Sequence, residues 1–275
     1  MNDLTVRLIA ADMDGSLLDN EHKLPSDFDS IYSELRSRGI MFTAASGRQY
    51  FNIVKNFPGK EDDMLFIAEN GSFVTHGKRE LLVQAMEPEI AHSQIRVART
   101  LPGVYPILCG KRCAYIDDNT PEFVDKLSLY YDRYEIVDDL LAVDDDEFLK
   151  IALCDFEGAE SNSYQHFRDK QDILQVKVSG KIWLDLSHPL ANKGRALRFL
   201  QEMFGVAPNE TMVFGDYLND LEMMKEAHFS FAMANAHPEV IKASRFLAPA
   251  NTEYGVTRVI SALLKGDLDK FPAST

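Results

Sequence analysis

Four short apolar runs, each followed at once by polar residues, constrain the fold of this chain more than any other sequence feature. The runs span residues 6–11, 40–45, 64–68 and 211–215, and their ends carry Asp12 with Asp14, Ser46, Asn70, and Asp216 with Asp220. Predominantly apolar runs of this length are typical of parallel strands that helices cover on both faces. Because ligands bind at the carboxyl ends of such strands, we expect these polar residues to converge at one edge of a sheet.

Helical patterns alternate with these runs at both ends of the chain. They cover residues 25–38 and 50–56, then 193–204, a segment from 218 onward and 255–264, with a short strand at 229–232. Strand, helix and strand in succession imply right-handed parallel crossovers. The sequence therefore predicts an α/β fold, a doubly wound parallel sheet to which both ends of the chain contribute.

The pattern changes between residues 81 and 187. This part has helical stretches at 89–101 and 122–131, strand-like stretches at 104–109, 148–154 and 174–179, and few carboxylates at strand ends. Such a change predicts a separate α+β unit inserted into the doubly wound domain. We expect a core made of residues 1–82 and 188–275 and an inserted unit made of residues 83–187.

The charge balance excludes some partners. Asp and Glu outnumber Lys and Arg by 43 to 29, which gives a formal net charge of −14. Such a chain repels nucleic acid and anionic membrane surfaces, although the acidity also serves solubility alone. A phosphate site in this chain must therefore supply its own cations, and a divalent metal ion is one way to do so.

The cysteines and the apolar segments favour a cytoplasmic protein. Cys109, Cys113 and Cys154 form no CxxC pair and have no histidine at zinc-ligand spacing, so we expect neither disulfides nor structural zinc. The first seven residues lack the features of a signal peptide, and no run of eighteen apolar residues occurs. We therefore expect no membrane span, and the sequence sets no oligomeric state.

Two carboxylates lie two residues apart in the segment DMDGSLLD at 12–19. On an extended backbone Asp12 and Asp14 point to the same side, and Gly15 permits a sharp turn after them. Two acids so placed can take two different roles in phosphoryl transfer. One attacks phosphorus, while the other gives a proton to the leaving oxygen and later takes one from water.

A second acidic pair lies in the segment GDYLND at 215–220. Asp216 and Asp220 can hold Mg²⁺, a hard ion that prefers oxygen ligands and keeps several waters beside a phosphate. A helix cap or a solvated turn is the alternative for each acid taken alone, and for Asp220 the two interpretations are evenly balanced. For all four acids together the alternative is weak, because strand-end acids seldom recur by chance.

Two further segments supply groups for an anion. Ser46-Gly47-Arg48 follows a predicted strand and opens a helix, so its hydroxyl and free amides can bind phosphate oxygens, although serine is also a common helix cap. Lys193 begins another helix, where a cation gains nothing from the helix dipole. This position favours a role facing an anion, with a solvated surface lysine as the alternative.

Four segments resemble, in order, the four motifs of the haloacid dehalogenase superfamily: DMDGSLLD, ASGR, NKGRAL and GDYLND. The segments ENG at 69–71, AMANA at 232–236 and NTEYGV at 251–256 are similar to its Cof-type branch, subclass IIB. ASGRQYF and CGKRCAYI further resemble bacterial sugar phosphatases of that branch. The resemblance covers the whole chain and implies a Rossmannoid core with an inserted C2-type cap.

The resemblance also implies residue roles. Asp12 would be the nucleophile and Asp14 the general acid and base. Mg²⁺ would be bound by the Asp12 carboxylate, the Asp14 backbone carbonyl and Asp216, with Asp220 acting through the metal's water shell. The groups expected to bind phosphate are the Met13 amide, Ser46, the Gly47 amide, Lys193 and the Asn219 side chain, with Asn70 at the same edge.

The leading hypothesis is a hydrolase of small phosphate monoesters, above all sugar phosphates, that forms an aspartyl phosphate. A phosphosugar mutase and a phospho-accepting signalling module without turnover are the alternatives. The cap would select the substrate. Six side chains in the cap or at its border are candidates, although packing or a solvated surface is the more common role for such residues: Tyr105, Lys111, Arg112, Tyr115, Trp183 and His188.

Overall fold

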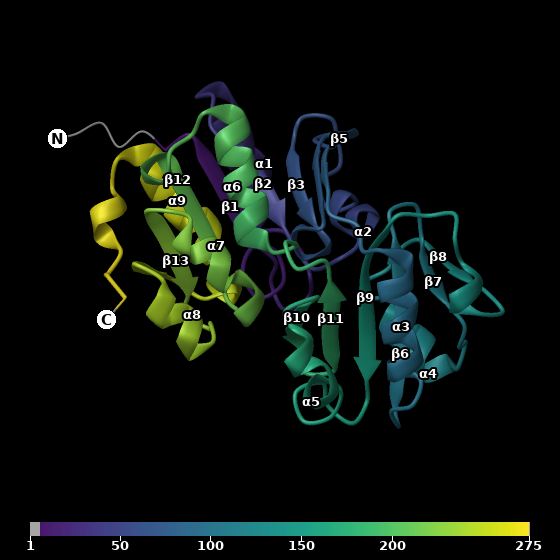
Figure 1. Cartoon of the computed structure of the whole chain (residues 1–275). Coiled ribbons are helices and arrows are strands. Elements are labelled where there is room, and N and C mark those ends of the chain that lie inside the picture. The colour runs from purple at the N-terminus through teal and green to yellow at the C-terminus, as the bar shows by residue number, and fades with distance from the viewer. Residues whose placement is uncertain (1–5, 275) are drawn as a thin grey trace.

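The computed structural model describes residues 6–274 and contains two β-sheets in that range (Figure 1). The larger sheet has eight strands in the order β14-β13-β12-β1-β2-β3-β4-β5, and the run from β14 to β3 is parallel throughout. Its strands are β1 (Leu8–Asp12), β2 (Met41–Ala45), β3 (Leu65–Ala68), β4 (Phe73–His76), β5 (Arg79–Val83), β12 (Thr211–Gly215), β13 (Phe229–Met233) and β14 (Phe246–Ala248). The doubly wound parallel sheet expected from the sequence is confirmed.

Both faces of this sheet are buried because successive side chains of each strand point to opposite sides. In β1, Leu8 and Ala10 belong to a hydrophobic cluster with residues of α6 (Lys193–Phe204), α7 (Leu221–Lys225) and α8 (Pro238–Ala243). Ile9 and Ala11 belong to a second cluster with residues of α1 (Phe28–Ser37), α2 (Tyr50–Val54) and α9 (Gly255–Lys265). This two-sided burial explains why β1 is apolar up to its last residue.

The smaller sheet has six strands in the order β10-β11-β9-β6-β7-β8 and lies beside the larger one (Figure 1). Along its central strand, Ile151 and Leu153 pack with residues of α3 and α5, whereas Ala152 and Cys154 pack with residues of α4 on the other face. The elements are β6 (Val104–Gly110), β7 (Ala114–Ile116), β8 (Tyr134–Ile136), β9 (Phe148–Asp155), β10 (Gln175–Gly180), β11 (Trp183–Ser187), α3 (Pro88–Ala98), α4 (Pro121–Leu127) and α5 (Ser163–Phe167). This is the expected inserted α+β unit, called the cap below.

The structure differs from the expected elements in several places. Strands β4, β5, β7, β8, β11 and β14 and helices α5 and α8 were not predicted from the sequence, because each is short and most have a partly exposed or polar position. The helix expected at 122–131 ends at Leu127, so Tyr130 lies in the segment beyond it and lines a pocket. The helix expected from 218 begins as a single 3₁₀ turn, and α7 starts at Leu221.

The domain boundaries at 82/83 and 187/188 stay predictions, with β5 ending at Val83 and β11 at Ser187. Residues 1–5, part of the segment for which no signal peptide is expected, lie outside the described residues. Within 6–274 no helix combines the length and apolarity that a membrane span requires. The three cysteines are buried and unpaired.

Candidate active site

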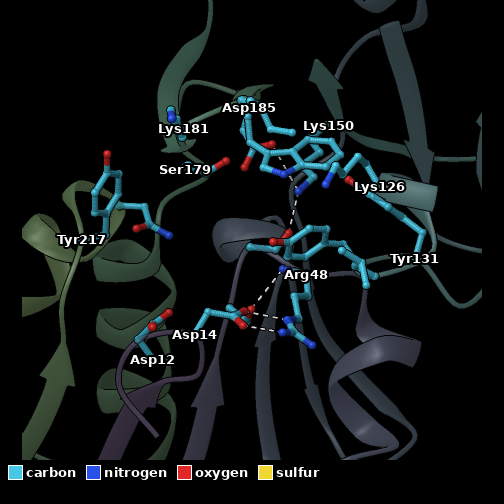
Figure 2. Close-up of a pocket in the computed structure, with 18 of the residues that line it drawn as sticks. Asp12, Asp14, Arg48, Lys126, Tyr131, Lys150, Ser179, Lys181, Asp185 and Tyr217 are labelled. Carbon is cyan, nitrogen blue, oxygen red and sulfur yellow. Dashed lines mark hydrogen bonds and ion pairs between the residues drawn. The ribbon is translucent and has the colours of Figure 1, made fainter. Parts of the chain in front are cut away.

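The carboxyl ends of four neighbouring parallel strands meet beneath the cap. Strands β12, β1, β2 and β3 lie side by side, and Asp216, Asp12, Ser46 and Glu69 lie at or just past their ends. A cavity of about 320 Å³ opens above this edge, with core residues on its floor and cap residues on its roof (Figure 2). The convergence expected from the apolar runs is confirmed for Asp12, Asp14, Ser46 and Asp216, which line the cavity, whereas Asn70 does not line it.

Asp12 lies on the floor of the cavity beside a fully buried lysine. Lys193 Nζ donates to Asp12 Oδ1 at 2.5 Å and to Asp220 Oδ1 at 2.7 Å. Lys193 begins α6, and the side chain of Asn192 caps this helix by accepting from the Arg195 amide. The lysine at a helix start is thus explained by two carboxylates, and the surface-lysine alternative is wrong.

These buried charges shift one another's protonation. Burial and the negative charge of Asp220 raise the pKa of Asp12 well above its usual range, although Lys193 opposes the shift. Burial alone would lower the pKa of Lys193, but the two carboxylates outweigh it and raise that pKa. The raised pKa favours the charged ammonium, which is positioned to neutralise an anion bound next to Asp12.

Asp216 completes a group of three acids. Asp12, Asp216 and Asp220 each offer an oxygen within 4.8 Å of the others. Burial and the charge of Asp220 raise the pKa of Asp216 to about 7. Three carboxylates beside one ammonium give a formal charge of −2, which one divalent cation would balance.

Asp220 has a different environment from the other two acids. Its Oδ2 accepts from the Asp216 amide at 3.0 Å and the Tyr217 amide at 3.3 Å, and its Oδ1 accepts from Lys193. Both oxygens are thus engaged within the protein. This arrangement fits a residue that orients Asp216 and Lys193 and influences a metal ion indirectly.

Gly15 permits the close approach between the two acidic segments. Its φ of +79° lies in the left-handed region, and a Cβ at this position would overlap the Asp216 carboxylate. A larger residue would be strained and would push the 12–19 segment away from Asp216. The glycine therefore sets the spacing between Asp12 and Asp216.

Asp14 points away from this group, toward Arg48 (Figure 2). Arg48 Nε donates to Asp14 Oδ2 at 2.6 Å, a second guanidinium nitrogen bonds Oδ1, and His22 Nδ1 lies 3.1 Å from Oδ1. Burial favours the neutral acid, but the hydrogen bonds from His22 and Arg48 outweigh it, so the pKa of Asp14 is lowered. Arg48 is therefore both a pocket residue and the partner that holds Asp14 ionised.

Ser46 and Gly47 form the neighbouring wall of the pocket. Ser46 Oγ accepts from the Arg48 amide at 3.1 Å, and Gly47 leaves room for Asn70, whose Oδ1 would lie 3.0 Å from a Cβ at position 47. Asn219 Nδ2 donates to Asn70 Oδ1 at 3.0 Å. Asn70 therefore supports Asn219 and the 46–48 loop and does not line the cavity itself.

Six of the nine predicted site residues line the cavity, namely Asp12, Asp14, Ser46, Gly47, Asp216 and Asn219. Met13, Lys193 and Asp220 are fully buried beside it. The Met13 side chain belongs to the hydrophobic cluster of α1 and α9, so only its backbone amide is a candidate phosphate ligand. Their functional roles stay predictions.

Of the six cap candidates, only Trp183 lines this cavity. Tyr105 stacks on Phe123 at a centroid distance of 5.0 Å, as the packing alternative predicts. Lys111, Arg112 and Tyr115 interact with acidic side chains away from the cavity, and His188 accepts from the Leu190 amide.

Ten cap residues of the cavity were not predicted from the sequence, namely Lys126, Leu129, Tyr130, Tyr131, Lys150, Ser179, Gly180, Lys181, Ile182 and Asp185. One signal for them was available in β11, whose alternation WLDLS puts Trp183 and Asp185 on one face and two leucines on the other. Lys150 likewise follows the alternation of β9, but an isolated lysine in a strand does not reveal which face is functional.

The doubly wound α/β sheet has clustered acids and a buried lysine at its carboxyl edge, with an inserted cap above them. This arrangement suits an enzyme of phosphoryl transfer. A model of the haloacid dehalogenase-like hydrolases matches residues 9–260, and the protein belongs to this family. The resemblance drawn from the motifs is thereby confirmed.

Individual relatives agree with this assignment. The 5-amino-6-(5-phospho-D-ribitylamino)uracil phosphatase YbjI of Escherichia coli is 32% identical over 265 residues, which cover 95% of this chain and 97% of that protein. The structure of SMU.1108c from Streptococcus mutans has a TM-score of 0.88 at 29% identity, covering 95% of this chain and all of that one. The subclass IIB sugar phosphatase BT4131 shares the fold, with a TM-score of 0.80 at 20% identity over 93% of this chain and 98% of that one. The expected enzyme class, a phosphoric monoester hydrolase, is confirmed.

Proposed function

We propose that the protein is a Mg²⁺-dependent phosphatase that hydrolyses small phosphate monoesters, above all sugar phosphates, through an aspartyl phosphate on Asp12. The observation that supports this most is the contact of Asp12 with buried Lys193 on the floor of the cavity beneath the cap. A nucleophile next to a fixed cation is what phosphoryl transfer requires, because its transition state spreads negative charge over the phosphoryl oxygens.

In the first step, an Asp12 oxygen forms a bond to phosphorus while the bond to the leaving oxygen breaks. Asp14 gives its proton to that oxygen. In the second step, water gives a proton to Asp14 and attacks phosphorus, which releases inorganic phosphate and restores the Asp12 carboxylate. Lys193, Ser46, Asn219 and the amides of Met13 and Gly47 would bind the phosphoryl oxygens.

Asp14 must be protonated for the first step, whereas Arg48 and His22 favour its ionised form. A phosphate dianion in the cavity would raise the pKa of Asp14, because a nearby negative charge disfavours ionisation. The substrate itself would thus help to prepare the acid. Arg48 would keep the side chain next to the cavity until then.

The residues on the floor of the cavity fit Mg²⁺. They offer only oxygen ligands, and their formal charge of −2 matches one divalent ion. Asp12, the Asp14 backbone carbonyl and Asp216 would hold it, with Asp220 outside the ligand shell. When bound, Mg²⁺ supplies positive charge that offsets the charge of the transferring phosphoryl group.

The roof of the cavity suits a polyhydroxylated leaving group. Tyr130 and Trp183 provide apolar ring surfaces and pack edge to face, with 5.3 Å between their ring centroids. Lys126 and Lys181 provide hydrogen-bond donors, and Asp185 provides an acceptor. The relative YbjI is named for a substrate in which the phosphate is carried by a ribityl chain attached to a uracil. The ribityl part of that substrate is a polyhydroxylated leaving group. A cytoplasmic location and small-molecule partners, without nucleic acid or membrane, complete the proposal.

A panel of phosphorylated sugars, sugar alcohols, nucleotides and cofactors tests this function. With Mg²⁺ we expect inorganic phosphate release, with the highest kcat/KM for a sugar or sugar-alcohol phosphate, and loss of activity with excess chelator. Isomerisation that depends on a bisphosphate and releases no phosphate would instead identify the mutase alternative. Stable labelling of Asp12 without turnover would identify the signalling alternative.

Asp216→Ala should raise the Mg²⁺ concentration that half-saturates activity, because one of few protein ligands is lost. In the parent protein this concentration should rise as the pH falls below about 7, since a proton on Asp216 competes with the metal. That part of the pH dependence should disappear in the variant. Mg²⁺ titrations of the phosphatase rate between about pH 6 and 8 measure both effects, because that range brackets the titration of Asp216.

Glu226→Gln is a suitable control, because Glu226 pairs with Arg198 outside the cavity. Its half-saturating Mg²⁺ concentration should equal that of the parent. If Asp216→Ala also saturates at the parent concentration at every pH, Asp216 is not a metal ligand.

A further inference from the structure

A second buried ionic cluster lies between the cap and the core, next to the cavity. It consists of Lys150 and Asp185 from the cap strands β9 and β11 and of Glu69, Asn70 and the Gly47 carbonyl from the core. All four side chains are at most 5% exposed. The family motifs do not include either cap residue of this cluster.

Lys150 is the centre of the cluster. Its Nζ donates to the Gly47 carbonyl at 2.5 Å and lies 2.9 Å from Glu69 Oε2 and 3.4 Å from Asp185 Oδ1. An ammonium group has three N–H donors; here one bonds the Gly47 carbonyl, and the Glu69 and Asp185 carboxylates lie at ion-pair distance on its other sides. Lys150 is therefore poorly placed to bind a substrate directly, although it lies at the wall of the cavity.

The bond from Lys150 to the Gly47 carbonyl contacts the segment Ser46–Arg48, which is the proposed phosphate-binding wall of the cavity. The Gly47 carbonyl and the Arg48 amide belong to one peptide unit, and that amide donates to Ser46 Oγ at 3.1 Å. Arg48 also bonds Asp14. Through this peptide, Lys150 is connected to the Ser46 hydroxyl and to the backbone of Arg48, whose side chain bonds Asp14.

The core side of the cluster has an unfavourable backbone. Glu69 and Asn70 have φ values of +50° and +55°, a left-handed conformation that residues other than glycine rarely adopt. Asp185 Oδ2 accepts from Asn70 Nδ2 at 2.5 Å, and Asn70 Oδ1 accepts from Asn219. The cap thus contacts the loop of Asn219 as well as that of Ser46.

We propose that Lys150 is a positioning residue, through which the seated cap fixes the phosphate-binding loop at Ser46–Arg48. Because the anchor of this loop comes from the cap, the phosphate site is complete only when the cap lies over the core. This inference rests on the proposed phosphatase function and adds a cap residue that affects the phosphate itself, independent of the leaving group.

Inhibition by inorganic phosphate tests the proposal in the Mg²⁺-loaded full chain. Lys150→Met should raise the inhibition constant for phosphate roughly 10- to 100-fold, the range typical of residues that orient a ligand-binding group. The fall in kcat/KM should be the same for p-nitrophenyl phosphate and for a sugar phosphate, because both share only the phosphoryl group. Thermal unfolding confirms that the variant is folded at the assay temperature.

Lys150→Met leaves two buried carboxylates without their cation and could prevent folding. The double variant Glu69→Gln with Lys150→Met avoids this problem, because both it and the parent cluster have a formal charge of −1. It should show the same rise in the inhibition constant. Lys177→Met is the matched control, since Lys177 joins cap to core through Glu222 at 2.6 Å outside the cavity. Its inhibition constant should equal that of the parent.

Two results would overturn the proposal. An unchanged inhibition constant in both Lys150 variants would mean that the cluster only stabilises the fold. A loss for the sugar phosphate alone, with phosphate inhibition unchanged, would mean that Lys150 binds the leaving group. If the parent protein neither hydrolyses phosphate esters nor binds phosphate, the proposed function fails, and this outcome is visible before any variant is made.

Discussion

Asp12→Asn should abolish turnover while the protein stays folded. The amide keeps the shape and an acceptor for Lys193, which also retains its bond to Asp220. It lacks the negative charge that attacks phosphorus. We expect a loss of roughly 10⁴- to 10⁶-fold in kcat, as for the removal of a nucleophile in other enzymes. Steady-state phosphate release with the best substrate of the panel measures it.

Two controls make this result interpretable. Mass spectrometry must exclude deamidation of the introduced asparagine back to aspartate, which would restore activity in part of the sample. Thermal unfolding should give a transition near that of the parent protein. Activity within about tenfold of the parent, in protein shown to be unmodified, would remove Asp12 from the role of nucleophile.

Asp14→Asn should slow phosphoryl transfer far more for a sugar phosphate than for p-nitrophenyl phosphate. A sugar alkoxide leaves poorly without a proton, whereas p-nitrophenolate needs little help. General acid catalysis typically contributes about 10² to 10⁴-fold, which sets the expected difference between the two substrates. The burst of the first turnover measures this step.

The steady state is unsuitable for this comparison, because the variant also loses the base that activates water. Hydrolysis of the aspartyl phosphate would then limit both substrates equally. Arg48 remains in place in this variant, so a change in the position of the 46–48 loop is not expected. Equal losses in the burst rates would contradict the acid role of Asp14.

The sequence predicts the core better than the cap for a physical reason. Strands such as β1 and β12 are buried on both faces, so their apolar runs have clear ends, and Asp12 and Asp216 follow at those ends. Cap strands such as β7 and β8 are only three residues long, and β8 includes exposed positions. Such short segments give no reliable periodicity.

The same reason explains which site residues could be predicted. Lys193 lies at a helix start, where its charge is unusual, so local sequence indicates its role. Lys150 lies in mid-strand, and its partners Gly47 and Glu69 are distant in sequence. Only the packing of cap on core brings these groups together. The pairing of Asp14 with Arg48 is likewise a tertiary contact that no spacing reveals.

The insertion also affects the order in which the chain can fold during synthesis. Strand β1 pairs with β12, so Leu8 meets Thr211 only after the roughly 200 residues between them have been made. The six strands of the cap come from one continuous segment, so their pairing needs nothing from the C-terminal part. The cap can therefore fold first. Until β12 and helices α6 to α8 are made, one face of strands β1 to β3 lacks its apolar partners. The candidate site is completed late, when Lys193, Asp216 and Asp220 meet Asp12, which is made 181 residues before Lys193.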